Sequence, residues 1–510
     1  MQTALTREAT KEREARVKPD FVRIVSFAIL LSLSAYVTYI YSLYWTLARL
    51  HPYAIEYEGH VFWACLNLAQ GANIYALSAL GADPHSVVMY NPLYFVIGAG
   101  LLKVFGTGFA PLRMLSMASA IISFLGLARL LQHSKSNTFI TILTVVGFAS
   151  LLPVAHWSTV ARVDFLGLAL AIWSMERFVS FWLSGDFRSK KLSVSLLLSL
   201  LAFFCKQQYF IFMAAMVGFA FAKGEKRLAI NYLASWSVVA LTIASLIQAL
   251  TGGYFAHLAF GAGLPWEWET LKLFILPFLF DPKTIVAFFV IFLANSKMAQ
   301  GLSRDFASEG TPPLTLLPAV LLILSLSLAL YTMGVRGAFH NHLLCAEFAL
   351  FWLAALSLNK LSFRFSVLAL LAVIVGIVPM LEFGGDLVYR TDRGPETART
   401  IDLLSSVAAK KPLILSEDPS LAIFAGAKPV LIDATTILNR AEARGEKLRG
   451  VLADLDSKAY GAVLINTHDA EEHRGSIWRS QIVEAISKNY RLVGKSGGNG
   501  MRQSVFLPKP

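Results

Sequence analysis

Long apolar stretches recur along this chain of 510 residues, and they constrain its fold more than any other feature of the sequence. Hydrophobic residues make up 56% of the chain and charged residues 15%, which excludes an ordinary cytosolic enzyme, a disordered chain and a fibrous repeat. About nine runs are long enough to cross a hydrocarbon core of ~30 Å as helices. They lie near 27–47, 112–132, 137–155, 165–183, 228–249, 272–295, 314–331, 342–358 and 365–381. The sequence therefore predicts an all-α polytopic membrane domain.

Basic residues set the expected orientation of these spans. The first apolar stretch follows a basic segment and lacks a small-residue cleavage site, so we expect an uncleaved first span with the N-terminus in the cytoplasm. The stretch 90–105 is short, and if it lies along the membrane surface the later basic loops all fall on the cytoplasmic side. We therefore predict a juxtamembrane helix there. The same topology accounts for the net charge of +12 without nucleic acid as a partner.

The apolar stretch 192–222 is interrupted by Lys206-Gln207-Gln208. Basic loops on both flanks belong to the same side, so the stretch crosses an even number of times and we predict a hairpin with Lys206 at its outer tip. Each arm has about 15 residues and spans roughly 22 Å, which is shorter than the hydrocarbon core of ~30 Å. A lysine held below the outer surface indicates an anion-binding function, whereas snorkelling to the headgroups is the structural alternative.

The sequence divides into three parts. Residues 1–22 form a cytoplasmic tail, and residues 23–383 form a membrane domain of about eleven transmembrane helices with a long first outer loop at 48–111. From Gly384 the composition changes, and residues 384–510 predict a small α/β domain, which the parity of the spans places outside the cytoplasm. Its predicted strands lie near 412–415, 429–432, 462–465, 491–493 and 504–507, and its predicted helices lie near 436–457 and 476–489.

With this topology, polar residues gather at the outer membrane boundary. They come from the first outer loop, the start of the fourth span, the hairpin tip and two later loops. Carboxylates and cations at this depth predict a site for a ligand that is both anionic and lipidic, because a lipid phosphate carries its charge there. The candidates are Glu56, Glu58, Tyr90, Arg162, Asp164, Lys206, Gln207, Glu267, Arg336, His340 and Asn341.

Structural roles compete with these assignments. The positions of Glu56 and Glu58 are as consistent with a helix cap and a solvated loop charge as with a general base. The position of Asp164 is consistent with the N-cap of its span. Glu267 fits an interfacial loop beside a tryptophan belt better than catalysis. His340 and the next histidine lie two residues apart, on different faces of a helix, which disfavours a metal site built from both.

These residues resemble the GT-C superfamily of polytopic glycosyltransferases, which use polyprenyl-phosphate-linked sugars and include protein O-mannosyltransferases and lipid A aminoarabinose transferases. The resemblance covers nearly the whole chain and rests on short motifs. They are Glu56-Tyr57-Glu58-Gly59, Tyr90-Asn91-Pro92-Leu93-Tyr94, Ala161-Arg162-Val163-Asp164-Phe165 and Lys206-Gln207-Gln208. Many relatives carry Asp in place of Glu56 and a second proline in place of Asn91, so either acid of the first loop remains a candidate base.

The resemblance implies a glycosyltransferase that moves a hexosyl or pentosyl group from polyprenyl phosphate to an acceptor hydroxyl on the outer face, by an inverting displacement. Glu58 or Glu56 would deprotonate the acceptor, and Asp164 would orient it or share that role. Lys206, with Arg162 or Arg336, would stabilise the leaving phosphate. The residues expected to contact substrate are Tyr90, Gln207, His340, Asn341 and Glu267.

The expected partners are the polyprenyl-phosphate-sugar donor, the cell membrane and an acceptor that is a glycan, a lipid or a protein. No cofactor is assigned, and a divalent cation stays open because some relatives use one. The three cysteines are scattered through apolar runs and indicate neither a disulfide framework nor a zinc site. Two other functions remain as alternatives: a lipid or solute transporter, and an inactive scaffold of a glycan assembly complex. Asp281-Pro282 interrupts one span but has no evident counterpart, which counts against a transporter of two matching halves.

Overall fold

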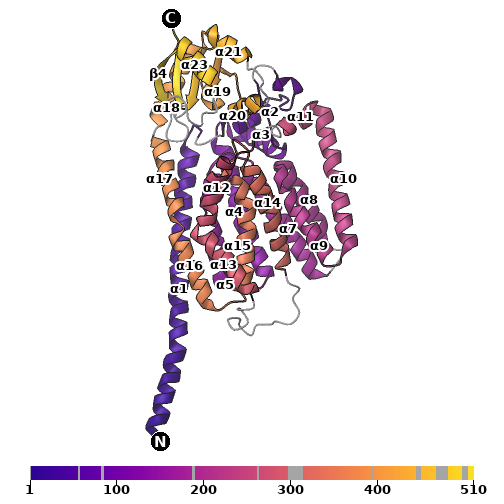
Figure 1. Cartoon of the computed structure of the whole chain (residues 1–510), viewed down its shortest axis with the longest axis vertical. Coiled ribbons are helices and arrows are strands. Elements are labelled where there is room, and N and C mark those ends of the chain that lie inside the picture. Colours follow the sequence, from indigo (N-terminus) through magenta and orange to yellow (C-terminus); the bar gives the residue numbers. More distant parts are fainter. Residues whose placement is uncertain are drawn as a thin grey trace.

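The computed structural model describes residues 2–510 apart from 55–57, 82–84, 186–189, 261–263, 297–313, 393, 444–448, 467–479 and 497–502. A tall helical bundle lies below a small α/β domain, and the N-terminus and the C-terminus lie at opposite ends of the molecule (Figure 1).

Among the described residues, seven helices are long and apolar enough to cross a membrane, and the number is nine if each of two bent pairs is one span. The long helices are α1 (Gln2–Leu50), α4 (Ala110–His133), α7 (Asp164–Ser184), α10 (Lys226–Thr251), α14 (Leu316–Met333), α15 (Leu344–Leu358, preceded by the 3-10 turn η5, His340–Leu343) and α16 (Phe363–Val375, continued by α17, Val378–Asp392). The bent pairs are α5 (Thr138–Ala149) with α6 (Leu152–Thr159), and α12 (Trp268–Phe280) with α13 (Pro282–Asn295). These elements match the nine apolar runs of the sequence, and the predicted polytopic all-α domain is confirmed.

Two of the expected spans are bent instead of straight. The axis turns by 65° between α5 and α6 and by 66° between α12 and α13. At the second bend, Asp281 caps α13 by accepting a hydrogen bond from the backbone N–H of Lys283 at 2.7 Å, and Pro282 occupies the first position of the new helix. A proline also lies in the first turn of α6. Because proline lacks an N–H and clashes with the preceding turn, each bend lies where proline begins a helix.

The predicted hairpin consists of α8 (Lys190–Cys205), the 3-10 turn η2 (Gln207–Tyr209) and α9 (Phe210–Ala222), with Lys206 at the break. The eleven spans that we expected included the two arms of this hairpin, whereas the described helices that are long and apolar enough to cross a membrane number seven to nine and include neither arm. The stretch predicted as a juxtamembrane helix forms α3 (Leu93–Phe105). The outer loops also contain α2 (Gly59–Ala69), η1 (Leu77–Leu80) and α11 (Tyr254–Phe260).

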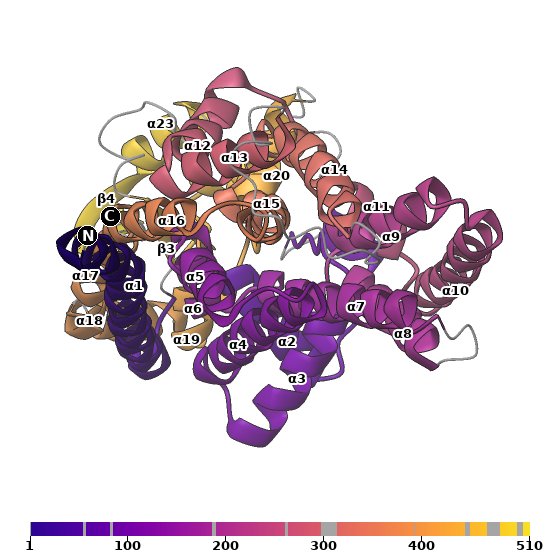
Figure 2. The same ribbon diagram turned by 90° about the horizontal axis from the view of Figure 1, so that it is seen from below.

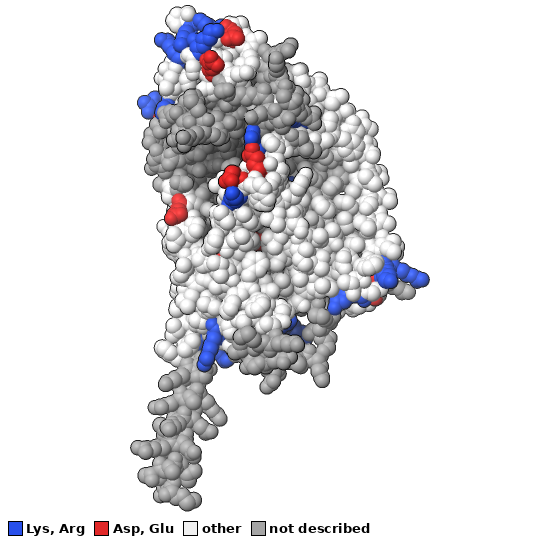
Figure 3. Space-filling model, in the orientation of Figure 1, with Lys and Arg blue, Asp and Glu red and all other residues white. Residues whose placement is uncertain are grey.

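Helix α15 lies near the middle of the bundle in the view from below, while α10 projects to one side (Figure 2). All fifteen residues of α15, Leu344–Leu358, are buried. Below a group of acidic and basic side chains near the α/β domain, the face shown in Figure 3 carries a broad belt almost free of charged groups, which extends down to the lower loops. A surface of this kind is expected where a protein contacts lipid tails.

The predicted C-terminal α/β domain is confirmed. Its sheet has the strand order β2-β1-β3-β5-β4, in which β1 pairs in parallel with β2 and β3, and β5 pairs in antiparallel with β3 and β4. The strands are β1 (Leu413–Ser416), β2 (Lys428–Pro429), β3 (Ala462–Asn466), β4 (Tyr490–Ser496) and β5 (Gln503–Pro508). The helices are α18 (Gly394–Ala408), α19 (Pro419–Phe424), α20 (Ala434–Ala443), α21 (Arg449–Asp456) and α23 (Ser480–Asn489). The helix expected over 436–457 is thus α20 and α21, and α17 runs through residue 384 without a break.

The α/β domain packs directly on the first outer loop. His85 forms a parallel bridge with Leu431, in which the His85 N–H donates to Val430 O at 2.8 Å and the Ile432 N–H donates to His85 O at 3.0 Å. Phe424 of α19 stacks on Phe62 of α2, with 5.5 Å between the ring centroids. The first outer loop is therefore held between the helical bundle and the C-terminal sheet.

Candidate active site

A buried polar centre lies where the start of α7, the tip of the α8–α9 hairpin and η5 meet. Asp164 Oδ1 accepts hydrogen bonds from Lys206 Nζ at 2.6 Å and from Asn341 Nδ2 at 2.9 Å. The three residues are 0%, 3% and 3% exposed, so the ion pair is shielded from water. Asp164 Oδ2 and Asn341 Oδ1 have no hydrogen-bond partner among the described residues. The centre therefore keeps two buried acceptor atoms available to a ligand.

Arg162 brings a second cation to this region. Its Nη2 donates to Tyr90 OH at 2.9 Å, and its Nη1 lies 3.1 Å from His60 Nε2. Burial, helped by the charge of Arg162, lowers the pKa of His60, so the imidazole is neutral and can accept from the guanidinium. The Arg162 guanidinium and Lys206 Nζ each lie 5.6 Å from the centroid of the Tyr90 ring, and Arg162 also lies 5.3 Å from the Trp157 ring. Two cations from different segments thus converge on one aromatic ring.

The local fold explains how Asp164 reaches this position. The chain leaves α6 at Thr159 and starts α7 at Asp164, where the helix dipole favours a carboxylate. Val163 is the N-cap residue and makes no side-chain cap, so the alternative that Asp164 only caps its span is not observed. Tyr209 OH donates to Asp164 O at 2.5 Å, and its ring covers Gly167, where a Cβ would clash with the ring.

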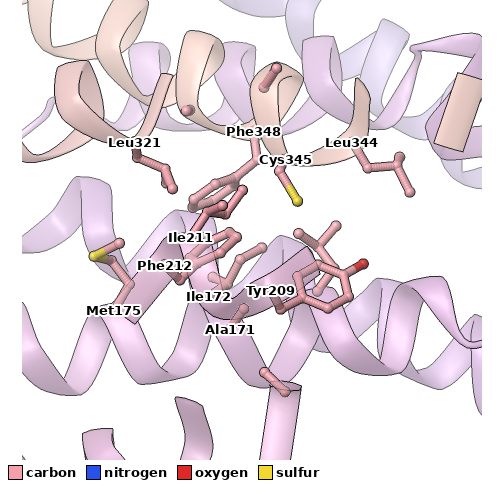
Figure 4. Close-up of a cluster of buried hydrophobic side chains, with 14 of the residues drawn as sticks. Ala171, Ile172, Met175, Tyr209, Ile211, Phe212, Leu321, Leu344, Cys345 and Phe348 are labelled. Atoms are coloured by element: carbon pink, nitrogen blue, oxygen red, sulfur yellow. The ribbon is translucent and has the colours of Figure 1, made fainter. Parts of the chain in front are cut away.

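A packed apolar core supports the polar centre from below. Side chains of α7, α9, α14 and α15 interdigitate there, with Tyr209 and Cys345 at its edge (Figure 4). Because such a core is as dense as an organic crystal, it holds the ends of these helices in register. The labelled members are Ala171, Ile172, Met175, Tyr209, Ile211, Phe212, Leu321, Leu344, Cys345 and Phe348.

Glu58 lies in a different arrangement, in which both of its oxygens are engaged. Its Oε1 accepts from Arg113 Nε at 2.9 Å and from the Ala161 N–H at 2.6 Å, and its Oε2 accepts from Arg113 Nη2 at 2.6 Å. Both side chains are fully buried. Arg113 also donates to backbone carbonyls at and just after the end of α1, those of Ala48, His51 and Tyr53. This geometry suits a residue that holds the loop in place. Glu56, the other predicted acid, lies outside the described residues.

Gln207 and His340 lie beside the polar centre. Gln207 Nε2 donates to Met89 O at 2.9 Å, which ties the hairpin tip to the first outer loop, and Gln207 Oε1 has no partner among the described residues. The His340 ring centroid lies 5.7 Å from that of Trp157. Gln207 follows Lys206 in the chain, and Trp157, which His340 contacts, also contacts Arg162. Both residues therefore lie next to the polar centre.

Glu267 and Arg336 pair with each other between two outer loops. Arg336 Nε donates to Glu267 Oε1 at 2.8 Å, and the side chains of Arg336 and Glu267 are 34% and 33% exposed. The hydrogen bond from Arg336 lowers the pKa of Glu267, so the pair is ionised at neutral pH. The Glu267 N–H also donates to Gly334 O at 2.6 Å. This arrangement matches the interfacial loop that the sequence offered as the alternative for Glu267.

The sequence reasoning missed Asp418, an acid of the α/β domain that lies against the start of α2. Asp418 Oδ1 accepts from the Ser420 N–H at 2.7 Å, and a Cβ on Gly59 would lie 2.5 Å from the same oxygen. Burial raises the pKa of Asp418 to about 6, and the charge of Glu58 adds to this, while hydrogen bonds from Ser420 and Gly59 oppose it. The signal in the sequence was Asp418-Pro419-Ser420, a typical helix N-terminus.

Arg113 and Asp433 were missed for different reasons. Arg113 is an arginine at the start of an apolar run, and a charge in such a place predicts a buried partner. Asp433 accepts from the Thr436 N–H at 3.0 Å and lies close enough to Arg162 to interact with it electrostatically. Burial raises the pKa of Asp433, and the hydrogen bonds from Thr436 and the charge of Arg162 oppose this. No local pattern connects Asp433 to Arg162.

Within the described ranges, no group of three or more His, Cys, Asp or Glu side chains could hold a metal ion. The three cysteines, Cys65, Cys205 and Cys345, are buried free thiols.

The fold matches solved structures of a membrane enzyme. The structure of ArnT from Cupriavidus metallidurans bound to undecaprenyl phosphate aligns with a TM-score of 0.60 and 12% sequence identity, over 94% of this chain and 99% of that chain. Its apo form aligns with a TM-score of 0.56 and 13% identity, over 93% and 98% of the two chains. No family model and no curated protein matches the sequence. ArnT is an aminoarabinose transferase with the GT-C fold, so the fold expected from the motifs is confirmed for this chain.

Proposed function

We propose that this chain is a membrane glycosyltransferase that moves a sugar from a polyprenyl-phosphate donor to an acceptor hydroxyl. The observation that carries the proposal is the buried centre of Asp164, Lys206 and Asn341, with Arg162 beside it. Charged groups buried at the edge of a membrane domain indicate a binding site when ligand-accepting atoms remain open. The donor class is supported by the ArnT structure of the same fold, which was solved with undecaprenyl phosphate.

Lys206 and Arg162 are the proposed phosphate ligands. They approach the same Tyr90 ring from different segments, so one phosphate can meet both cations. Cations held in a dry site stabilise the charge that develops on the leaving phosphate when the glycosidic bond breaks. Arg336, also considered from the sequence, is engaged with Glu267 in an outer loop and is assigned to that loop instead.

Asp164 is the proposed general base. When a phosphate binds Lys206, the carboxylate loses its cation partner and Oδ2 is open to the acceptor hydroxyl. The acceptor oxygen then forms a bond to the anomeric carbon, the bond from that carbon to the phosphate oxygen breaks, and the proton passes to Asp164. Attack opposite the leaving group inverts the anomeric carbon. Glu58 positions the loop through Arg113, and Glu56 is the second candidate base.

Donor binding tests this proposal. The full chain in phospholipid nanodiscs is titrated with undecaprenyl phosphate, and Lys206→Ala is compared with Lys272→Ala, which removes an exposed lysine paired with Glu269. We expect Lys206→Ala to weaken binding about tenfold or more, since a charge-assisted bond in a buried site is lost, and Lys272→Ala to bind like the wild type. Equal affinity of all three proteins would remove the phosphate assignment.

The proposed location is the cell membrane, with the N-terminus in the cytoplasm and the α/β domain outside. The basic loops near 188–191, 223–227 and 360–364 support it, because they would all face the cytoplasm. A cysteine introduced as Ser189→Cys should react with an impermeant maleimide only after the cells are opened. Labelling of intact cells at this position contradicts the orientation.

A further inference from the structure

A second buried polar cluster lies where the two bent helices turn. Lys283 Nζ donates to Ser150 O at 3.0 Å and to Gly376 O, and it lies 3.5 Å from Asp281 Oδ2. Ser150 follows the end of α5 and Gly376 follows the end of α16, so the ammonium satisfies carbonyls at two helix C-termini. Lys283 and Asp281 therefore have structural roles. Glu347 lies close enough to both to interact with them electrostatically, and its role is not explained by these contacts.

A cavity of about 310 Å³ lies beside this cluster, among α6, α12, α13, α15 and α17. Most of its lining is apolar, but Glu347 and Thr284 also line it, at 2% and 0% exposure. Glu347 Oε2 and Thr284 Oγ1 have no hydrogen-bond partner in the described part of the chain. Buried polar atoms are nearly always paired, so two unpaired atoms on one cavity indicate an occupant that forms hydrogen bonds.

The cavity has one edge toward the bilayer and another toward the polar centre. On the α12 side it is lined by Leu273 and Pro277, which lie on the exposed apolar surface, and Leu273 is 65% exposed. An occupant that enters there comes from the lipid phase. On the η5 side it is lined by His340, whose ring neighbours Trp157, and Trp157 in turn contacts Arg162.

We infer that this cavity is the acceptor subsite and that the acceptor is a lipid. Its apolar chain occupies the space along α12, and a hydroxyl, ester or amide group of that chain forms hydrogen bonds with Glu347 and Thr284. Its head reaches the Asp164 centre past His340. The inference rests on the proposed glycosyltransferase function and adds to it the chemical class of the acceptor.

Photolabelling tests whether a lipid chain occupies the cavity. The full chain is placed in nanodiscs of phosphatidylethanolamine and phosphatidylglycerol that contain a phosphatidylethanolamine with a diazirine on one acyl chain. We expect adducts on the cavity segments 273–278 and 343–347. Leu273→Trp should remove them by obstruction, whereas Leu276→Trp, an exposed position of the same helix outside the lining, should keep them.

Conservative changes test the two polar groups in the same experiment. Glu347→Leu and Thr284→Val should each lower cavity labelling about tenfold, as expected for the loss of a buried hydrogen bond to the ligand. Equal labelling in every variant would show that the lipid reaches these segments from outside the cavity, and no labelling of the wild type would show a cavity that holds water alone. Either result would overturn the inference.

Two further measurements separate the acceptor assignment from the proposed function. In cells that lack the gene and are complemented with each variant, the gene-dependent glycosylated product should be found in the lipid extract with wild type and Leu276→Trp, and should be lost with Leu273→Trp. A product found only in protein, or one that persists in Leu273→Trp, overturns the lipid acceptor. Binding of undecaprenyl phosphate should be unchanged in all these variants. If the wild type did not bind undecaprenyl phosphate, the proposed donor would be refuted, and the photolabelling result would still stand.

Discussion

Two buried ion pairs lie at the end of the bundle nearest the α/β domain, and they differ in whether polar atoms remain without a hydrogen-bond partner. Around Glu58 and Arg113, both carboxylate oxygens and the guanidinium are engaged with the protein itself. Around Asp164 and Lys206, one carboxylate oxygen and a neighbouring amide oxygen have no partner among the described residues. Equal burial therefore does not mean equal function. A saturated pair holds segments together, whereas an unsaturated pair is prepared for a ligand.

The largest expected effect is on turnover at Asp164. Asp164→Asn keeps the shape of the side chain but removes the base, so we expect sugar transfer to fall by about 10²–10⁴-fold. The variant also leaves Lys206 buried without its anion, which lowers the melting temperature. Undecaprenyl phosphate should restore that temperature, because its phosphate replaces the lost carboxylate. Activity within tenfold of the wild type would move the base role to Glu56 or Glu58.

The Glu58–Arg113 pair should behave in the opposite way. Arg113→Met leaves the buried Glu58 carboxylate without its cation and three carbonyls without this donor, so we expect the free energy of unfolding to fall by about 3–5 kcal/mol. Undecaprenyl phosphate should not restore it. The double variant Glu58→Gln with Arg113→Met should recover part of the loss, since no charge remains buried alone. Chemical denaturation of the three proteins measures the difference, and a stable, inactive Arg113→Met protein would contradict the structural role.

The contact of Asp418 with the start of α2 predicts a smaller, pH-dependent effect. The pKa of Asp418 is about 6 in the folded protein and 3.8 without burial, so the native state favours the protonated acid. Its contribution to stability is therefore greatest below about pH 4 and is lost as the pH rises through about 6. Asp418→Asn should reduce the change in melting temperature between pH 5 and pH 7.5, whereas Glu484→Gln, an exposed acid of the same domain, should leave it unchanged.

The smallest effect on stability is expected at the partly exposed pair of Glu267 and Arg336. Ion pairs of this exposure contribute about 0–1 kcal/mol, so Glu267→Gln and Arg336→Gln should shift the melting temperature little. Affinity for undecaprenyl phosphate should also stay at the wild-type value. A large loss of donor affinity in Arg336→Gln would bring this arginine back into the phosphate site.

The sequence predicted the helices well because apolar length is a local property. Each apolar run became a helix or a bent pair, and the bends follow from prolines that were visible in the sequence. Lys206 was also predicted at the break of a hairpin, because a charge between two short apolar arms has few other places to go.

The sequence was less informative about which carboxylate keeps an oxygen available to a ligand. That property depends on partners far along the chain: Arg113 is 55 residues from Glu58, and Asn341 is 177 residues from Asp164. Asp433 and Asp418 approach the site only because the α/β domain folds back onto the first outer loop. Motifs identified the right region, but hydrogen-bond saturation is a property of the assembled structure.

The bridge between His85 and Leu431 joins the first outer loop to a segment just after β2, which is synthesised much later than the loop. Until the α/β domain has folded onto it, the first outer loop lacks this neighbour, and Asp433 is not yet beside Arg162. In a nascent or truncated chain that lacks the α/β domain, the helices would therefore insert while the site around Arg162 stays incomplete. Docking of the α/β domain is therefore an assembly step that insertion of the helices alone does not accomplish.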